Sequence, residues 1–225
     1  MSNENLGKIF EKVGKKYGYD SVKAEFVAYR DFKVKWTRSY KWAEFQVSDY
    51  LTDAPDIVIE GLAKTLFERI LQISVGPYPQ EMTDYITSPE FKKNKQPIYI
   101  RRTRGVTKSP VGENKDLTDS LQRLKDMGLV DKDVNPYLTW TKNELTSTVG
   151  YCSTLMDTVV MSSVFDDSTI PDSVLDFALY HELLNIREGW AGFGKGEEID
   201  IVEEEEKFPD YKVADTWIRR LGLHL

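Results

Sequence analysis

The sequence feature that most constrains the fold is the segment LDFALYHELLNIREGW, residues 175–190. At roughly 100° per residue, apolar side chains cover most sides of a helix formed by this segment, and such a helix is buried in a protein core. His181, Glu182 and Asn185 are polar residues of the same helix, and His181 and Asn185 fall on one stripe. Polar groups in a buried helix need partners. The chain must therefore build a core around this helix and supply those partners.

The spacing of the three polar residues is close to that of a zinc-binding motif. In the motif His-Glu-x-x-His, two histidines at positions i and i+4 bind zinc from one helix face, and the glutamate activates the attacking water. His181 stands at the first histidine position and Glu182 at the glutamate position, whereas Asn185 replaces the second histidine. An amide oxygen is a weak ligand that suits calcium or magnesium better than zinc. The alternative is that His181 is a core histidine hydrogen-bonded to Glu182.

Apolar residues recur at helical spacing, about every 3.6 residues, in some segments and alternate with polar residues in others. The two patterns together predict a mixed α+β fold. Helices are expected over residues 6–17, 56–73, 116–127 and 172–186 and around 217–221, and strands over 32–36, 45–47, 138–140 and 153–165. The second helix has Asp53 as its expected N-cap and Pro55 in its first turn. Its expected buried stripe is Ile57, Val58, Leu62, Leu66, Ile70 and Ile73.

Charge and composition restrict the class of protein. The net charge of −7 argues against binding of nucleic acid or anionic membranes by the whole surface. The one cysteine, Cys152, excludes an intrachain disulfide, fits a reducing compartment and is expected to be a buried structural thiol. No apolar stretch is typical of a signal peptide or a membrane span. We therefore expect a cytoplasmic protein with no membrane partner.

A basic segment is the main exception to the acidic composition. Residues 90–108 contain seven basic residues and one acidic residue. Phe91 and Tyr99 are interleaved with them and could stack on bases. The candidate nucleic-acid-binding residues are Lys92, Lys93, Arg101, Arg102 and Arg104. At a net charge of −7, a solvated loop that offsets the acidic C-terminal segment is the favoured interpretation.

The order of segments around the motif resembles that of archaeal SprT-like and minimal-gluzincin metallopeptidases of the zincin superfamily. The segments are FQVSDYLTDAPDIVIEGLAKTLFERI (45–70), TVGYCSTLMDTVVMSSVFDDSTIPDSVLDFALYHELLN (148–185) and EEEEKFPDY (203–211). The resemblance implies a zincin-like domain over residues 36–225, with a small twisted sheet whose edge strand lies over an active-site helix and a supporting helix. Residues 1–35 would form an N-terminal helix and a first strand, and residues 77–115 a basic loop insertion.

The resemblance also implies roles for single residues. His181 matches the first zinc ligand and Glu182 the general base, while Asn185 departs from the family's second histidine. The family takes a third ligand from downstream, where Glu205 shares the inward face of an expected helix over 197–208. Glu197 is the alternative third ligand. His224 is an unlikely substitute because chain ends are commonly frayed.

Three functions follow from these expectations. The first is a metallopeptidase-like protein with a degenerate zinc motif, weak or absent peptidase activity and a capacity to bind peptides or proteins. The second is an active metal-dependent peptidase with an altered ligand set. The third is a DNA-associated protein that uses the basic segment 92–108. Zinc is the expected metal if any is bound, and its content in the purified protein discriminates the first two functions.

Overall fold

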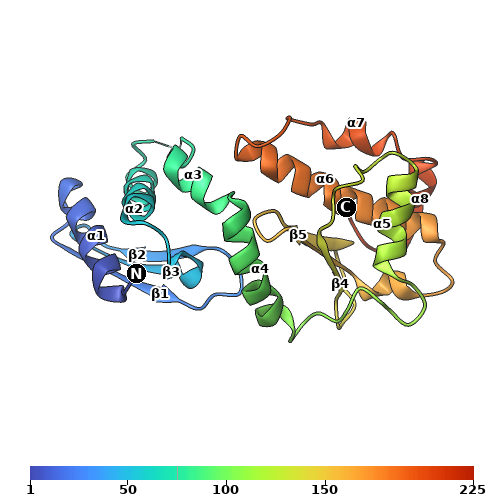
Figure 1. The fold of residues 1–225 in the computed structure, drawn as a ribbon, viewed down its shortest axis with the longest axis horizontal. Coiled ribbons are helices and arrows are strands. Elements are labelled where there is room, and N and C mark those ends of the chain that lie inside the picture. The colour runs from blue at the N-terminus through green and yellow to red at the C-terminus, as the bar shows by residue number, and fades with distance from the viewer. Residues whose placement is uncertain (75) are drawn as a thin grey trace. The chain divides into compact units, whose positions relative to one another are not determined.

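The structure is a computed structural model that describes residues 1–74 and 76–225, and it confirms a mixed α+β fold (Figure 1). The chain divides into two compact units, residues 1–95 and 96–225. The expected boundary between residues 35 and 36 falls inside strand β2 (Val34–Arg38). That strand pairs with β3 (Trp42–Ser48), so both sides of the expected boundary belong to one sheet.

The first unit combines a three-stranded sheet with helices. Its elements are α1 (Asn3–Lys16), β1 (Ser21–Val27), β2, β3, the short 3-10 helix η1 (Asp49–Leu51), α2 (Asp56–Ile70), α3 (Gln80–Ile86) and the start of α4 (Pro89–Thr103). The strand order is β1-β3-β2, with β1 parallel and β2 antiparallel to β3. The hairpin of β2 and β3 was expected from the alternating residues. Strand β1 was not expected at these residues, although Val22, Ala24 and Phe26 alternate with charged residues there as in a half-buried strand.

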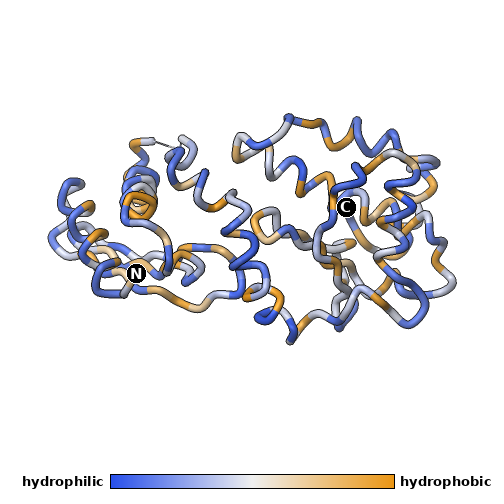
Figure 2. Tube along the Cα trace, viewed as in Figure 1, coloured by the Kyte–Doolittle hydropathy of each residue, from blue (hydrophilic) through white to orange (hydrophobic). Residues whose placement is uncertain are grey.

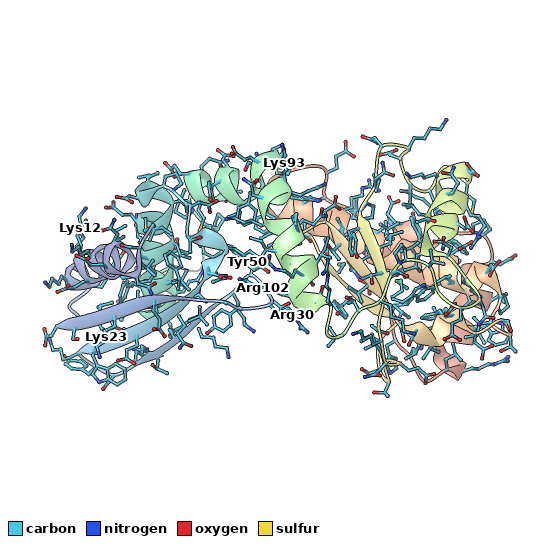
Figure 3. All side chains as sticks on the ribbon, turned by 60° about the horizontal axis from the view of Figure 1, so that its bottom comes forward. Lys12, Lys23, Arg30, Tyr50, Lys93 and Arg102 are labelled. Carbon is cyan, nitrogen blue, oxygen red and sulfur yellow. The ribbon has the colours of Figure 1, made fainter. Side chains whose placement is uncertain are left out.

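The core of the first unit forms where α1 and α2 pack together and α1 covers the sheet. Phe45 on β3 and Phe67 on α2 are fully buried, with ring centroids 5.2 Å apart. Gly14 allows the helices to approach, because a Cβ there would lie 2.8 Å from the Phe67 ring. Figure 2 shows the hydrophobic stretch of α2. Nearby, the buried Tyr50 donates its hydroxyl hydrogen to the carbonyl oxygen of Arg30, a pair labelled in Figure 3.

Two expectations about α2 are wrong. Its N-cap is Pro55, and the Asp53 carboxylate instead accepts hydrogen bonds from Tyr85 and Lys95. Ile57 and Ile73 are exposed, at 56% and 64%, whereas Ile59 and Phe67 are buried.

The basic segment is not a loop. Helices α3 and α4 occupy most of residues 80–103, and α4 contains Pro97 in its interior. Phe91 and Tyr99 are 2% and 3% exposed, so both rings are buried in the protein interior. Lys95 is also buried, and its ammonium lies 2.6 Å from an Asp53 oxygen.

The second unit is built around one long helix. It contains α5 (Leu117–Asp126), β4 (Tyr137–Trp140), β5 (Gly150–Ser153), β6 (Thr158–Met161), the 3-10 helix η2 (Ser163–Asp166), α6 (Asp172–Gly192), α7 (Ile201–Glu205) and α8 (Tyr211–Arg220). The strand order is β4-β6-β5, with β4 parallel and β5 antiparallel to β6. The expected strand over 153–165 instead contains the last residue of β5, a turn, β6 and most of η2. Asp157, at φ 44°, lies in that turn.

Helix α6 is buried on most sides, as its sequence predicts. Within the second unit it packs against α5, α7, α8, β5 and β6. The helix expected to support it, over residues 56–73, is α2 and belongs to the first unit. The C-terminus is not frayed, because the backbone of His224 bonds to both Ser147 and Val149. In the described part of the chain, no helix is long and apolar enough to cross a membrane.

Candidate functional site

The histidine of the motif meets a carboxylate from α7. His181 Nδ1 lies 2.5 Å from Glu205 Oε1, and the two side chains are only 13% and 15% exposed. Asp200 caps α7 by accepting from the backbone N–H groups of Val202 and Glu203. This cap sets the start of the short helix that carries Glu205. The sequence-predicted proximity of His181 and Glu205 is therefore present in the structure.

The other ring nitrogen of His181 meets the residue that replaces the second histidine. Asn185 Nδ2 lies 3.0 Å from His181 Nε2, one helical turn away. With the amide nitrogen facing the ring, Nε2 accepts this hydrogen bond and Nδ1 carries the proton that is donated to Glu205. Both ring nitrogens of His181 are then engaged by side chains.

Glu182 faces the sheet and is 4% exposed. Burial raises the pKa of Glu182, although His181 and hydrogen bonds with Cys152 and Asn185 act in the lowering direction. Burial, followed by the charge and hydrogen bond of Glu182, raises the pKa of Cys152 to about 12. The thiol is therefore protonated at neutral pH and donates to Glu182.

These contacts form one continuous polar network within the second unit. It runs from Cys152 on β5 through Glu182, Asn185 and His181 on α6 to Glu205 on α7. Figure 1 shows α6 between α7 and β5. Gly150 permits the close approach of β5, because a Cβ there would lie 2.5 Å from the Val160 carbonyl oxygen and 3.3 Å from Glu182 Oε1.

Cys152 is the member of the network that the sequence did not predict. It has no histidine near it in sequence, and its position depends on the β5–β6 register, in which it faces Val159. The structure shows it half-buried rather than fully buried. Its partner is Glu182, the residue next to His181 in the motif.

The remaining acidic candidates lie elsewhere. Glu197 is exposed and lines a pocket of about 530 Å³ with Tyr180 and Glu204, among others. Glu204, which the sequence did not single out, accepts a hydrogen bond from Lys207 at 2.6 Å and contacts the Tyr180 hydroxyl. The side chain of His224 is exposed.

The chemistry of the donor set does not fit a catalytic zinc ion. Such an ion almost always has three protein ligands drawn from histidine, cysteine and carboxylate side chains. His181 is the one imidazole of the network, and Asn185 offers a neutral amide. Among residues 1–74 and 76–225, no three His, Cys, Asp or Glu side chains are arranged to hold a metal ion.

The candidate nucleic-acid-binding residues lie on or next to α4. Lys93, Arg101 and Arg104 are exposed, whereas Lys92 and Arg102 are half-buried. Lys93 and Arg102 are labelled in Figure 3. The buried rings of Phe91 and Tyr99 are not available to stack on bases, which removes the aromatic part of that hypothesis.

Comparisons with models of protein families, with curated proteins and with solved structures find no match to this chain.

Proposed function

We propose that residues 96–225 form a metallopeptidase-like domain with a degenerate zinc motif, which has weak or no peptidase activity and binds peptides. The observation that carries the proposal is the engagement of both His181 ring nitrogens, one by Glu205 and one by Asn185. A metal ion at this histidine would have to displace one of these partners.

The order of elements also supports a zincin-like domain. The hairpin β5–β6, the motif helix α6 and the carboxylate-bearing α7 follow one another as in the resemblance noted above. Glu205 contacts His181. It lies downstream of the motif helix, as the third ligand does in the family that the sequence resembles. The segment 45–70 lies in the first unit, so the proposal is confined to residues 96–225.

The side chains of the network account for weak catalysis. Asn185 occupies the nitrogen of His181 that faces the motif's second position. Glu182, the residue matched to the general base, accepts from Cys152 and lies in a site whose burial raises its pKa. Peptide binding would use β5, an edge strand of the sheet, by addition of an extended peptide.

The test is the substitution Asn185→His. Wild-type protein is expected to be purified with substoichiometric zinc and to show no measurable peptidase activity. The variant restores two imidazoles one turn apart, and its melting temperature should rise when zinc is added. The larger ring costs about 1 to 3 kcal/mol in zinc-free protein.

The matched control is the double variant His181→Ala/Asn185→His, which keeps the new ring but removes the first ligand and should not respond to zinc. Stoichiometric zinc in the wild type, measured by elemental analysis, would favour the alternative of an active peptidase with an altered ligand set. A folded Asn185→His protein that ignores zinc would contradict the zincin-like assignment.

A further inference from the structure

Strand β2 of the first unit lies at an edge of its sheet. Two hydrogen bonds fix its register: Ser48 N–H donates to the Lys33 carbonyl at 3.1 Å, and Ser39 N–H donates to the Trp42 carbonyl at 2.9 Å. Bonded and non-bonded pairs alternate in an antiparallel ladder. The intervening residues that bond to β3 are therefore Lys35 and Thr37.

The other residues of β2 direct their backbone groups outward. These are Val34, Trp36 and Arg38, which pair with β3 residues at the non-bonded positions. Among residues 1–74 and 76–225, the backbone groups of these residues have no hydrogen-bonding partner. Exposed strand edges of this kind are sites where an extended peptide can add as a further strand.

The side chain of Trp36 at this edge is partly exposed to solvent. Trp36 shares a sheet face with its partner Phe45, but Trp36 is 48% exposed while Phe45 is 1% exposed. Trp36 lines a groove of about 1070 Å³ that is bordered by one side of α1 and by all three strands. The apolar floor of the groove continues to Val22 and Phe45.

The charge of the edge indicates its partner. Residues 30–41 contain five basic residues and one acidic residue, in a chain of net charge −7. Three of the four glutamates that line the groove form ion pairs: Glu4 with Lys8, Glu11 with Lys15, and Glu44 with Lys23, which Figure 3 labels on β1. The fourth, Glu25, accepts a hydrogen bond from the Gln46 amide. Lys35 and Arg38 have no carboxylate partner in the described part of the chain.

We propose that the outer edge of β2 binds an extended, acidic peptide segment of another protein, which adds to the sheet as a fourth strand. Apolar side chains of the segment would pack on Trp36 in the groove, and acidic side chains would face Lys35. A second copy of β2 fits less well, because its own lysines would meet like charges across the new ladder.

Single-stranded nucleic acid also fits less well. The two exposed tryptophans of the hairpin lie on opposite faces of the sheet. Trp36 lies on the face of its partner Phe45, which is also the face of Ala43. Trp42 precedes Ala43 along β3 and therefore points to the other face. The two tryptophans do not form one stacking platform. The inference rests on the first unit and is independent of the function proposed for residues 96–225.

The probe is a fluorescein-labelled peptide of about ten residues that alternates glutamate and valine, long enough for one strand. Its binding to the full chain is measured by fluorescence anisotropy. Two matched peptides test the mode of binding: one has lysine in place of glutamate, and one is N-methylated at alternate residues so that its bonding edge is blocked. Both are expected to bind at least about tenfold more weakly.

Three variants test the surface. Lys35→Glu should weaken binding about tenfold, whereas Lys16→Glu, the same charge change at an exposed position of α1, should change it less than about twofold. Val34→Pro removes one outward N–H at the first residue of an edge strand, where proline is tolerated, and should also weaken binding. Asn185→His should have no effect.

Several results would overturn the proposal. They are an absence of binding at about 1 mM peptide, equal binding of the N-methylated peptide, and tighter binding of an oligodeoxythymidine than of the acidic peptide. Concentration-dependent dimerisation that is abolished by Val34→Pro would instead assign the edge to a second copy of the chain.

Discussion

Helix α2 in the first unit and helix α6 in the second are both buried, but they bury different kinds of side chain. The buried face of α2 is apolar apart from Thr65. Helix α6 also buries Asp176 and Glu182 and half-buries His181. An apolar face accepts any partner surface of suitable shape, whereas each buried polar group requires a complementary atom at a defined place. The neighbours of α6 are therefore more narrowly specified than those of α2.

The largest effect is expected from truncating the α2 core. Phe67 is fully buried and contacts Tyr17, Tyr19 and Phe45 at centroid distances of 5.7, 5.1 and 5.2 Å. Phe67→Ala should destabilise the first unit by about 3 to 5 kcal/mol, because it removes a large apolar side chain and leaves a cavity. Hydrogen exchange of the amides in α1, α2 and β3 measures this loss.

Ile57→Ala is the matched control, since Ile57 is on the same helix and 56% exposed. It should change stability by about 0.5 kcal/mol or less. A similar cost for both substitutions would show that α2 is not packed as described.

The next effect concerns a buried carboxylate of α6. Asp176 is 1% exposed and accepts two hydrogen bonds from Arg123 at 2.7 Å and one from Ser120 at 2.5 Å. Asp176→Ala leaves both donors on α5 without their acceptor. The expected cost is about 2 to 4 kcal/mol, below the full value for a buried pair because Arg123 is 37% exposed and can be hydrated.

Glu188→Ala, at an exposed position of α6, serves as the control and should cost about 0.5 kcal/mol or less. The measurement is denaturant unfolding together with hydrogen exchange of α5 and α6. A neutral Asp176→Ala would mean that α6, like α2, depends on its apolar contacts alone.

The fold could be predicted from the sequence where periodicity is strong. Helices α1 and α5 each combine a clear apolar pattern with a recognisable end, at Gly18 and Gly128, both of which adopt positive φ. Helix α6 was predicted from its apolar pattern, but it continues to Gly192, beyond the expected end at residue 186. Helix α4 was missed because basic residues and Pro97 obscure its pattern. The β5–β6 turn was missed because Asp157 adopts positive φ within a run that contains no glycine or proline signal.

The candidate site was predictable only in part. The proximity of Glu205 and His181 followed from helical faces, since each residue lies on the inward side of its own helix. The contact between Cys152 and Glu182 depends on a strand register and on the space left by Gly150. Neither of these can be read from the spacing of residues along the chain.

The smallest effect is expected at Cys152. Here the two kinds of burial predict opposite orders of stability for the variants Cys152→Val and Cys152→Ser. In a core like that of α2, Cys152→Val would be tolerated better than Cys152→Ser. Next to α6, the thiol donates to Glu182, and serine keeps a donor that valine lacks. Cys152→Ser should change stability by less than about 1 kcal/mol, and Cys152→Val should cost about 1 to 2 kcal/mol at neutral pH.

The pH dependence separates this explanation from simple packing. Because the pKa of Glu182 is raised in the folded state, its contribution to stability is present below the ordinary pKa of a glutamate and is lost as pH rises through the folded pKa. Valine removes one of the hydrogen bonds that favour the charged carboxylate, so its cost should appear only where Glu182 is ionised. Denaturant unfolding from pH 4 to pH 8 should therefore show the valine and serine variants converging at the acidic end. A difference that stays constant with pH would mean that the Cys152 side chain acts through its shape and not through its hydrogen bond to Glu182.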